Sequence, residues 1–419
     1  MREMKDSHIG WVHQIPSNWE TIRGKYVFTN NKYIVGAKVV EYERLALTLN
    51  GVIKRSKDDN EGLQPDKFDT YQILKENELV FKLIDLQNIS TSRVGLSPFT
   101  GIVSPAYIIL KANKQIYPAF AEKYYLMMWM NQVFNALGDA GVRSSLNSTE
   151  LLELWLPLPP IDEQKSIAQY LDRECSKIDG VMADIQNQID TLEEHKKSAI
   201  AEAVTKGLHP NIEMKDSGVS YIGQIPSHWK IDKGKYIFNY IQKPVREDDG
   251  VITCFRDGEV TLRSNRREDG FTISEKEIGY QGIDKGDLIV HGMDGFAGAI
   301  GISDSRGKAS PVLNVLETSN NKRYYMYFLR NMAYRGVFIA LTTGIRVRTC
   351  DTNWGKLREI SYALPPKKEQ DEIANNLDKK CAEIDSIIAD KKSELDTLEE
   401  YKRSLIYEYV TGKKEVPNE

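Results

Sequence analysis

The sequence predicts an α+β protein in which two similar globular domains are separated by a pair of long antiparallel coiled-coil helices, related by a pseudo-two-fold axis. Three observations predict this fold: the chain is a tandem duplication, each copy ends in a long helical heptad pattern, and the intervening stretches carry strand and turn signals. The expected boundaries are a first globular domain at 1–158, a central helix at 159–209, a second globular domain at 210–364, and a distal helix with its tail at 365–419.

The duplication is clearest where each copy begins. MKDSHIGWVHQIPSNW at 4–19 recurs as MKDSGVSYIGQIPSHW at 214–229, and Gly24-Lys25-Tyr26 recurs as Gly234-Lys235-Tyr236, all at an offset of 210. An ungapped match of this length between two parts of one chain indicates a true internal repeat.

The ends of the two copies also match, whereas their middles do not. The segments 159–205 and 365–411 share 24 identities in 47 positions, but 20–155 and 230–361 share only scattered positions. The matching end segments therefore have the same role in both copies. The middle segments keep a common scaffold but differ in their surfaces.

The matching ends are predicted to be long helices with apolar seams. Proline is absent after Pro159-Pro160 until Pro210, and Gly207 and Pro210 are expected to end the first helix. Apolar residues spaced by three and four among Asp, Glu and Lys indicate a coiled-coil seam. The predicted seam consists of Ile178, Met182, Ile185, Ile189 and Leu192, continued by Ala199 and Ala203, and in the second copy of Ile373, Leu377, Ile384, Ile388, Leu395, Leu398, Leu405 and Tyr409.

Two such helices most simply bury their seams against each other. An antiparallel pair would place one globular domain at each end of a rod of roughly 65–70 Å, whereas a parallel pair would crowd both domains at one end. We therefore expect the antiparallel arrangement, with the helices holding two similar domains at a fixed separation.

The stretches between the helices carry β-branched and aromatic residues broken by Gly, Asn and Asp, which are strand and turn signals. A short helix is expected in each copy, at 119–136 and 322–340. Each copy is then a mixed α+β domain that leads into one long helix.

Composition limits the class of protein. The chain has 56 basic and 60 acidic side chains and a net charge of −4, which argues against a freestanding repressor-like DNA binder. The N-terminus lacks the apolar core of a signal peptide, no apolar run is long enough to span a bilayer, and the four cysteines form no CxxC pair. We expect a cytoplasmic protein without a metal site, disulfide framework or membrane contact.

Two similar domains at a fixed separation suit the recognition of two DNA half-sites around an unread spacer. Because the middles of the two copies differ, the half-sites would be unrelated and the recognised DNA sequence would be asymmetric.

The chain resembles the specificity subunit of type I restriction–modification enzymes. The resemblance rests on MKDSGVSYIGQIPSHW, on LPLPPIDEQKSIAQYLD and ALPPKKEQDEIANNLD, and on TLEEHKKSAIAEAVTKG and TLEEYKRSLIYEYVTGK, and it covers essentially the whole chain. It implies that the globular domains are target-recognition domains that read double-stranded DNA, and that the chain itself is non-catalytic.

The resemblance also implies partners. Two adenine-N6 methyltransferase subunits, which bind S-adenosylmethionine, would dock on the helices, and the target adenine would be flipped into the partner's pocket. Two ATP-driven translocase and nuclease subunits, which use ATP and magnesium, would complete the restriction enzyme. No cofactor is expected on this chain.

The candidate DNA-binding residues are basic side chains in predicted loops, which can pair with guanine or grip phosphate. They are Lys54, Arg55, Lys57, Arg143 and Ser144 in the first domain and Arg256, Arg263, Arg266, Arg267, Arg346 and Arg348 in the second. The alternative for each is a solvated or ion-paired surface turn, since Asp257 and Glu259 accompany the second-domain arginines.

Other prominent residues are expected to be structural. The GMDGFAGAIG run at 292–301 lacks the Lys-Ser/Thr of a phosphate-binding loop and is expected to be a tight turn between strands, with His291 structural. Trp19 and Trp229 are expected to anchor the repeated opening segments, and Cys175 and Cys381 to be small buried hydrophobes.

Two rival functions stay open from the sequence. A self-contained enzyme would show cofactor-dependent activity without partners, although no adenine methyltransferase motif, ATP-binding loop or nuclease pattern is found in the sequence. A structural adaptor protein with coiled-coil arms would explain the helices and the acidic balance, but not the two differing, arginine-bearing domains.

Overall fold

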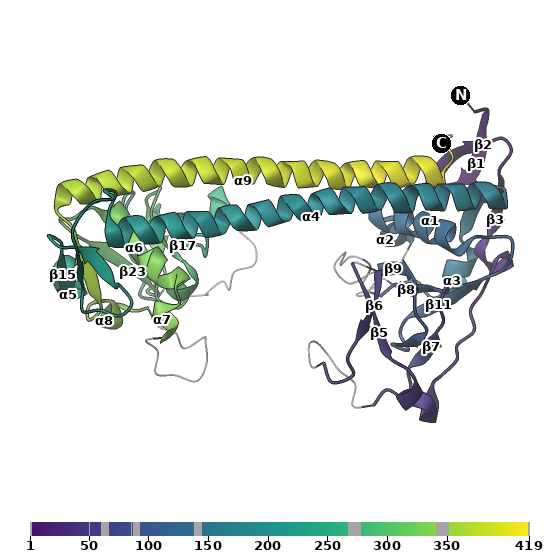
Figure 1. Cartoon of the computed structure of the whole chain (residues 1–419), viewed down its shortest axis with the longest axis horizontal. Helices are drawn as coiled ribbons and strands as arrows, with labels where there is room; N and C mark the ends of the chain where they lie inside the picture. Colours follow the sequence, from purple (N-terminus) through teal and green to yellow (C-terminus); the bar gives the residue numbers. More distant parts are fainter. Residues whose placement is uncertain are drawn as a thin grey trace. The chain divides into compact units, whose positions relative to one another are not determined.

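The computed structural model describes residues 2–49, 51–59, 67–84, 86, 93–137, 145–266, 278–340 and 352–417. The chain forms two compact units, one made of 1–185 with 392–419 and the other of 186–391. Each unit combines a β-rich domain with one part of each of two long helices, α4 (Ile161–Lys206) and α9 (Lys367–Val410) (Figure 1). No helix in these ranges is both long enough and apolar enough to cross a membrane.

The first unit contains two four-stranded sheets, with strand orders β6-β5-β10-β7 and β4-β11-β8-β9, and the strand pairs β1-β2 and β12-β3. The strands are β1 (Met4–Ile9), β2 (Val12–Pro16), β3 (Glu20–Arg23), β4 (Phe28–Thr29), β5 (Arg44–Thr48), β6 (Gly51–Arg55), β7 (Gln72–Leu74), β8 (Leu79–Lys82), β9 (Arg93–Leu96), β10 (Gly101–Val103), β11 (Ile108–Ala112) and β12 (Trp155–Leu158).

The second unit has one four-stranded sheet, β16-β23-β20-β21, and the pairs β13-β14, β15-β24, β17-β18 and β19-β22. The strands are β13 (Met214–Asp216), β14 (Gln224–Pro226), β15 (Lys230–Lys233), β16 (Asn239–Ile241), β17 (Ile252–Cys254), β18 (Val260–Leu262), β19 (Gln281–Ile283), β20 (Leu288–His291), β21 (Ile300–Ile302), β22 (Gly307–Ala309), β23 (Leu313–Glu317) and β24 (Ser361–Leu364).

The two domains share one strand topology. The sheet β4-β11-β8-β9 corresponds strand by strand to β16-β23-β20-β21, and the antiparallel hairpin β5-β6 corresponds to β17-β18. A buried glutamine holds the same place in each: Gln72 Nε2 donates to the carbonyl of Tyr107, and Gln281 Nε2 donates to the carbonyl of Leu313. The scattered identities between the two middles therefore lie on a common scaffold.

The short helices differ from the single helix expected in each copy. They are α1 (Pro118–Met130) followed by α2 (Val133–Leu137), and α6 (Lys322–Tyr334) followed by α7 (Val337–Ala340). The chain turns through a left-handed residue between the members of each pair, Gln132 with φ 55° and Gly336 with φ 67°, and this conformation ends an α-helix. Further short helices in the described ranges are α3 (Ser148–Glu153), α5 (Gly234–Ile237) and α8 (Trp354–Leu357).

The long helices are antiparallel within each unit, as predicted. In the first unit the rings of Tyr170 and Tyr409 lie 4.6 Å apart, and Asp179 pairs with Lys402 at 2.6 Å. Residue numbers therefore increase along α4 in the direction in which they decrease along α9. In the second unit Lys196 pairs with Asp385 at 2.6 Å, and these two positions are the repeat equivalents of Lys402 and Asp179.

Most of the predicted seam is buried. Ile178, Ile185, Ile189, Ile384, Ile388 and Leu405 are each less than 9% exposed, whereas Met182, Leu192, Leu395 and Leu398 are partly exposed. The expected continuation is buried at Ala203 and partly exposed at Ala199. Ile200 and Val204 are also buried, because this end of α4 packs on aromatic side chains of α6 as well as on α9.

The repeated tryptophans join each β-rich domain to a long helix. Trp19 and Trp229 are fully buried, as expected for packing anchors, and their indole nitrogens donate to Glu163 and Glu369 at the starts of α4 and α9. The next residue in each helix is a buried glutamine: Gln164 accepts from the amide of Tyr117, and Gln370 accepts from the amide of Asn321. The repeated Pro-Pro-x-x-Glu-Gln motif therefore clamps each domain to its helix.

Candidate nucleic-acid interface

The predicted basic side chains that the structure describes gather on equivalent hairpins of the two domains. Lys54 and Arg55 end β6, and Lys57 follows two residues later, while Arg256 and Arg263 flank the strands of the β17-β18 hairpin. Each hairpin borders a surface hollow. The sequence did not reveal this equivalence, because the two hairpins share no recognisable motif.

In the first domain the hollow measures about 450 Å³ and is lined by residues 40–44 and 54–58. Its basic side chains are all engaged. Lys54 pairs with Glu43 at 2.6 Å, Arg55 pairs with Asp59 at 2.5 Å, and Lys57 donates to the carbonyl of Val39 at 2.6 Å. The hollow therefore presents two ion pairs and a lysine held by a backbone carbonyl.

In the second domain the hollow measures about 640 Å³ and is bordered by the β17-β18 hairpin, the turn after β20 and the start of β23. Three predicted arginines line it together with acidic side chains and a histidine. The charged and titratable residues are Arg256, Asp257, Arg263, Arg266, His291, Asp294 and the thiol of Cys254.

The three arginines differ in how they are held. Arg266 pairs with Asp257 at 2.7 Å and with Glu259 at 2.8 Å, and its guanidinium lies 4.1 Å from the centroid of the Phe255 ring. Both of its terminal nitrogens are therefore used within the domain. Arg263 donates through Nε to the hydroxyl of Thr253 at 3.0 Å.

Arg256 is the most exposed of the three. Its side chain is 68% exposed, and among the described residues its one ion-pair partner is Asp294, reached through Nη2 at 2.8 Å. An arginine oriented by one carboxylate keeps further N–H donors for the O6 and N7 of guanine or for a phosphate. Asp294 lies 38 positions along the chain from Arg256, so sequence proximity could not identify it as the partner.

His291 and Cys254 are structural parts of this hollow. His291 Nδ1 accepts hydrogen bonds from the amides of Met293 and Asp294, and burial lowers the pKa of its imidazole. Burial raises the pKa of the Cys254 thiol to about 12. Both groups are therefore neutral near pH 7. The glycine-rich run after His291 forms a turn between β20 and β21, as expected.

Five of the predicted DNA-binding residues, Arg143, Ser144, Arg267, Arg346 and Arg348, lie outside the described residues. The structure thus brings Arg256, Arg263 and Arg266 together at one hollow, and Lys54, Arg55 and Lys57 together at the equivalent hairpin in the other unit.

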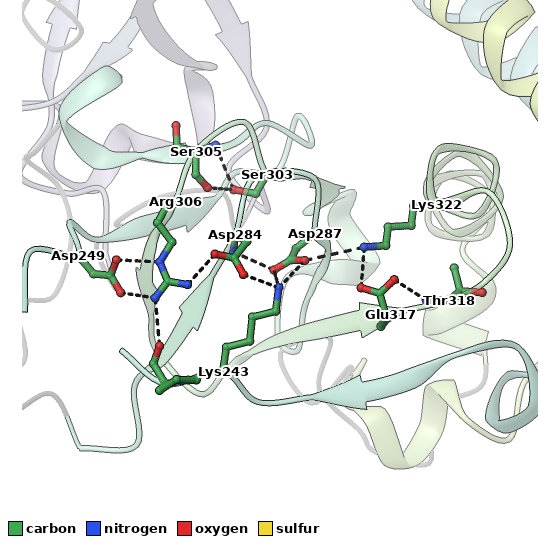
Figure 2. A network of polar contacts seen from close by, with 11 residues as sticks. Lys243, Asp249, Asp284, Asp287, Ser303, Ser305, Arg306, Glu317, Thr318 and Lys322 are labelled. Carbon is green, nitrogen blue, oxygen red and sulfur yellow. Dashed lines mark hydrogen bonds and ion pairs between the residues drawn. The ribbon is translucent and has the colours of Figure 1, made fainter. Parts of the chain in front are cut away.

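A second charged cluster in the 186–391 unit was not singled out from the sequence (Figure 2). Arg306 bridges Asp249 and Asp284, both at 2.7 Å, and Lys243 reaches Asp284 at 2.9 Å and Asp287 at 2.6 Å. Hydrogen bonds from Lys243 and Arg306 lower the pKa of Asp284 to about 2. Each charged group in this cluster is paired with a neighbour of opposite charge. The cluster therefore stabilises the loops of the domain and leaves little net charge for a ligand.

The distribution of charge removes an objection raised by composition. The helices α4 and α9 together hold 22 acidic and 14 basic side chains, so 38 acidic and 42 basic side chains are left for the rest of the chain. The helices carry −8 and the remainder +4. An overall charge of −4 is therefore compatible with DNA-binding domains.

Comparison with known proteins agrees with this architecture. Residues 16–200 match the family model described as the type I restriction modification DNA specificity domain. A protein of Methanocaldococcus jannaschii assigned as the type I restriction enzyme MjaX specificity subunit is 27% identical over 329 residues, covering 73% of this chain and 70% of that protein. The chain belongs to this family. It is the DNA specificity subunit of a type I restriction–modification system, and specificity subunits are non-catalytic.

The type I restriction enzyme MjaVIII specificity subunit of the same organism is 23% identical to this specificity subunit over 440 residues, covering all of this chain and 98% of that protein. A solved structure from work on complex assembly and conformational transition of the type I R-M system matches with a TM-score of 0.65 at 12% identity, covering 96% of this chain and 99% of that one. At this identity the structural match supports the fold. Within the described residues, no group of three or more His, Cys, Asp or Glu side chains is placed to hold a metal ion.

Proposed function

We propose that this specificity subunit reads an asymmetric, bipartite site in double-stranded DNA, one half-site per domain. The observation that carries the proposal is the pair of equivalent hairpins, β5-β6 and β17-β18. They occupy the same place in one scaffold and border a hollow in each domain, but they present different charged side chains. A shared scaffold with different donors and acceptors suits two reading heads that recognise different bases.

Of the candidate base-reading residues, Arg256 has the strongest support from the geometry, with Asp294 as the residue that positions it. Arg266 is better suited to bracing the hairpin, because two carboxylates and an aromatic ring already engage it. Lys54, Arg55, Lys57 and Arg263 are proposed as further contacts to bases or phosphates.

The helices are proposed to dock two methyltransferase subunits that carry S-adenosylmethionine, and two translocase subunits that use ATP and magnesium would join them for restriction. Support comes from the duplication, because α4 and α9 keep 24 identities in the 47 positions that contain most of their length. Two helices this similar suit a partner that binds twice.

The test is to map N6-methyladenine in DNA from cells that carry the specificity subunit with its methyltransferase. Replacement of 231–361 by the corresponding segment of another specificity subunit should change one half-site and leave the other unchanged. A change in both half-sites would contradict the assignment of one half-site to each domain. If the assembled complex shows no sequence selectivity at all, the structural adaptor becomes the better explanation.

A further inference from the structure

A repeated turn in the two domains carries an exposed tyrosine that the proposed function does not explain. The turns comprise residues 24–26 and 234–236, each reading Gly-Lys-Tyr, and are called here the Lys–Tyr turns. Tyr26 is 63% exposed and Tyr236 is 72% exposed. The other exposed aromatic residues in the described part of the chain have no aromatic counterpart in the second copy, so this pair stands apart.

Internal packing explains the glycine of each Lys–Tyr turn. A Cβ added at Gly24 would lie 3.2 Å from the carbonyl oxygen of Leu152, and one added at Gly234 would lie 2.3 Å from that of Leu357. Packing does not explain the tyrosines, because most of each ring faces solvent. An exposed side chain that stays the same in both copies, within middles that otherwise differ, indicates a contact made twice.

The charges around the Lys–Tyr turns favour a protein over a phosphate backbone as that contact. Glu153 accepts from both Arg23 at 2.6 Å and Lys25 at 2.8 Å, and Glu359 lies 3.6 Å from Lys235. Each carboxylate offsets part of the positive charge that would attract DNA. What is left exposed is a tyrosine ring held on a rigid turn, with a lysine 5.4–5.5 Å from its centroid. Such rigid aromatic side chains are typical anchors of protein interfaces.

We propose that the two Lys–Tyr turns are docking points for the methyltransferase subunit, one turn for each of its two copies, in addition to the helices. This inference rests on the proposed function, because it requires a partner that binds the chain twice. The partner surface that fits would hold a recess for the tyrosine ring and a polar group for its hydroxyl.

The experiment uses the full chain with its methyltransferase subunit and measures both stepwise dissociation constants by native mass spectrometry and analytical ultracentrifugation. Tyr26→Ala should weaken one of the two binding events about 10- to 100-fold, as expected for loss of an interface anchor, and Tyr236→Ala should do the same. The double variant should weaken both. Thermal unfolding should stay close to that of the parent chain, because the rings are exposed.

Tyr33→Ala is the matched control. Tyr33 is 53% exposed and has Lys75 5.6 Å from its ring centroid, but it does not recur. Its counterpart by backbone pairing is Lys243, because the carbonyls of Tyr33 and Lys243 accept from Ile73 and Gly282 respectively. This variant should bind two methyltransferase subunits as the parent does.

Three results would overturn the inference. The Tyr26 and Tyr236 variants could assemble like the parent chain, the Tyr33 variant could lose binding equally, or the turn variants could keep assembly while weakening DNA binding regardless of sequence. The last result would indicate that the Lys–Tyr turns contact the DNA backbone. Failure of the proposed function is distinguishable, because then the parent chain itself would not bind two methyltransferase subunits or select DNA.

Discussion

The indole nitrogen of Trp229 donates a hydrogen bond to Glu369 Oε2 over 2.8 Å, and Trp19 makes the same bond to Glu163 over 3.0 Å in the other unit. Each bond joins a fully buried ring in an opening segment to the first turn of a long helix that begins about 140 residues later. The bond therefore couples the position of a recognition domain to the helix that follows it.

Replacement of Glu369 by alanine should lower the free energy of unfolding by about 1–3 kcal/mol, because the buried indole N–H would lose its acceptor. The measurement is chemical unfolding of the purified chain. Glu399→Ala, at an exposed position on the same helix, should change the value by no more than about 0.5 kcal/mol. Equal effects of the two substitutions would show that the bond does not stabilise the fold.

Arg256 and Arg266 should respond differently to truncation. Arg256→Ala should reduce selectivity at one half-site by about 1–3 kcal/mol and leave stability nearly unchanged, because its side chain is 68% exposed. Arg266→Ala should instead destabilise the domain, because Asp257, Glu259 and Phe255 lose their shared partner. Competition binding with matched and mismatched DNA, with the methyltransferase present, would measure the first effect and unfolding the second. If Arg256→Ala lowered stability and Arg266→Ala lowered selectivity, Arg266 would be the base-reading residue and Arg256 the structural one.

The cluster around Arg306 should make the second unit sensitive to acid. Hydrogen bonds from Lys243 and Arg306 lower the pKa of Asp284 to about 2, and the bond from Arg306 also lowers the pKa of Asp249. A carboxylate with a lowered folded-state pKa contributes stability that is fully present above its ordinary pKa of about 3.9. That contribution is lost as the pH falls from there toward 2.

Arg306→Gln should therefore be less stable than the parent at pH 7 and lose less additional stability between pH 4 and pH 2. Urea unfolding at a series of pH values would measure both quantities. Parallel pH profiles for the parent and the variant would show that the Arg306 pairs do not control the acid response.

The cross-helix ion pairs Asp179–Lys402 and Lys196–Asp385 should contribute only modestly to the free energy of unfolding. Lys196→Met or Lys402→Met should each lower the free energy of unfolding by no more than about 1 kcal/mol, with a smaller effect in 1 M salt, because the aspartates are 55% exposed. The effects should add in the double variant, because the pairs lie in separate units. Strong non-additivity would indicate that the two ion pairs are energetically coupled.

Much of the fold was predictable because it is written in local or repeated patterns. The duplication follows from matching letters, the long helices follow from heptad spacing, and Gly207 ends α4 with a left-handed φ of 75°. The breaks at Gln132 and Gly336 were not predicted. Gly336 is a local signal for the end of a helix, because glycine adopts a positive φ without strain, whereas Gln132 carries no such signal.

The amino-acid sequence alone establishes that this protein contains a tandem duplication, that each copy ends in a long amphipathic helix, and that basic side chains interrupt each β-rich middle. The three-dimensional structure was needed to show which of those side chains are already paired and that two unlike hairpins are equivalent. The difference lies in how far apart along the chain the interacting residues are. Helical periodicity is set by neighbours within one or two turns, whereas the pair Arg256–Asp294 depends on atoms brought within 2.8 Å across 38 positions of chain, which local patterns do not record.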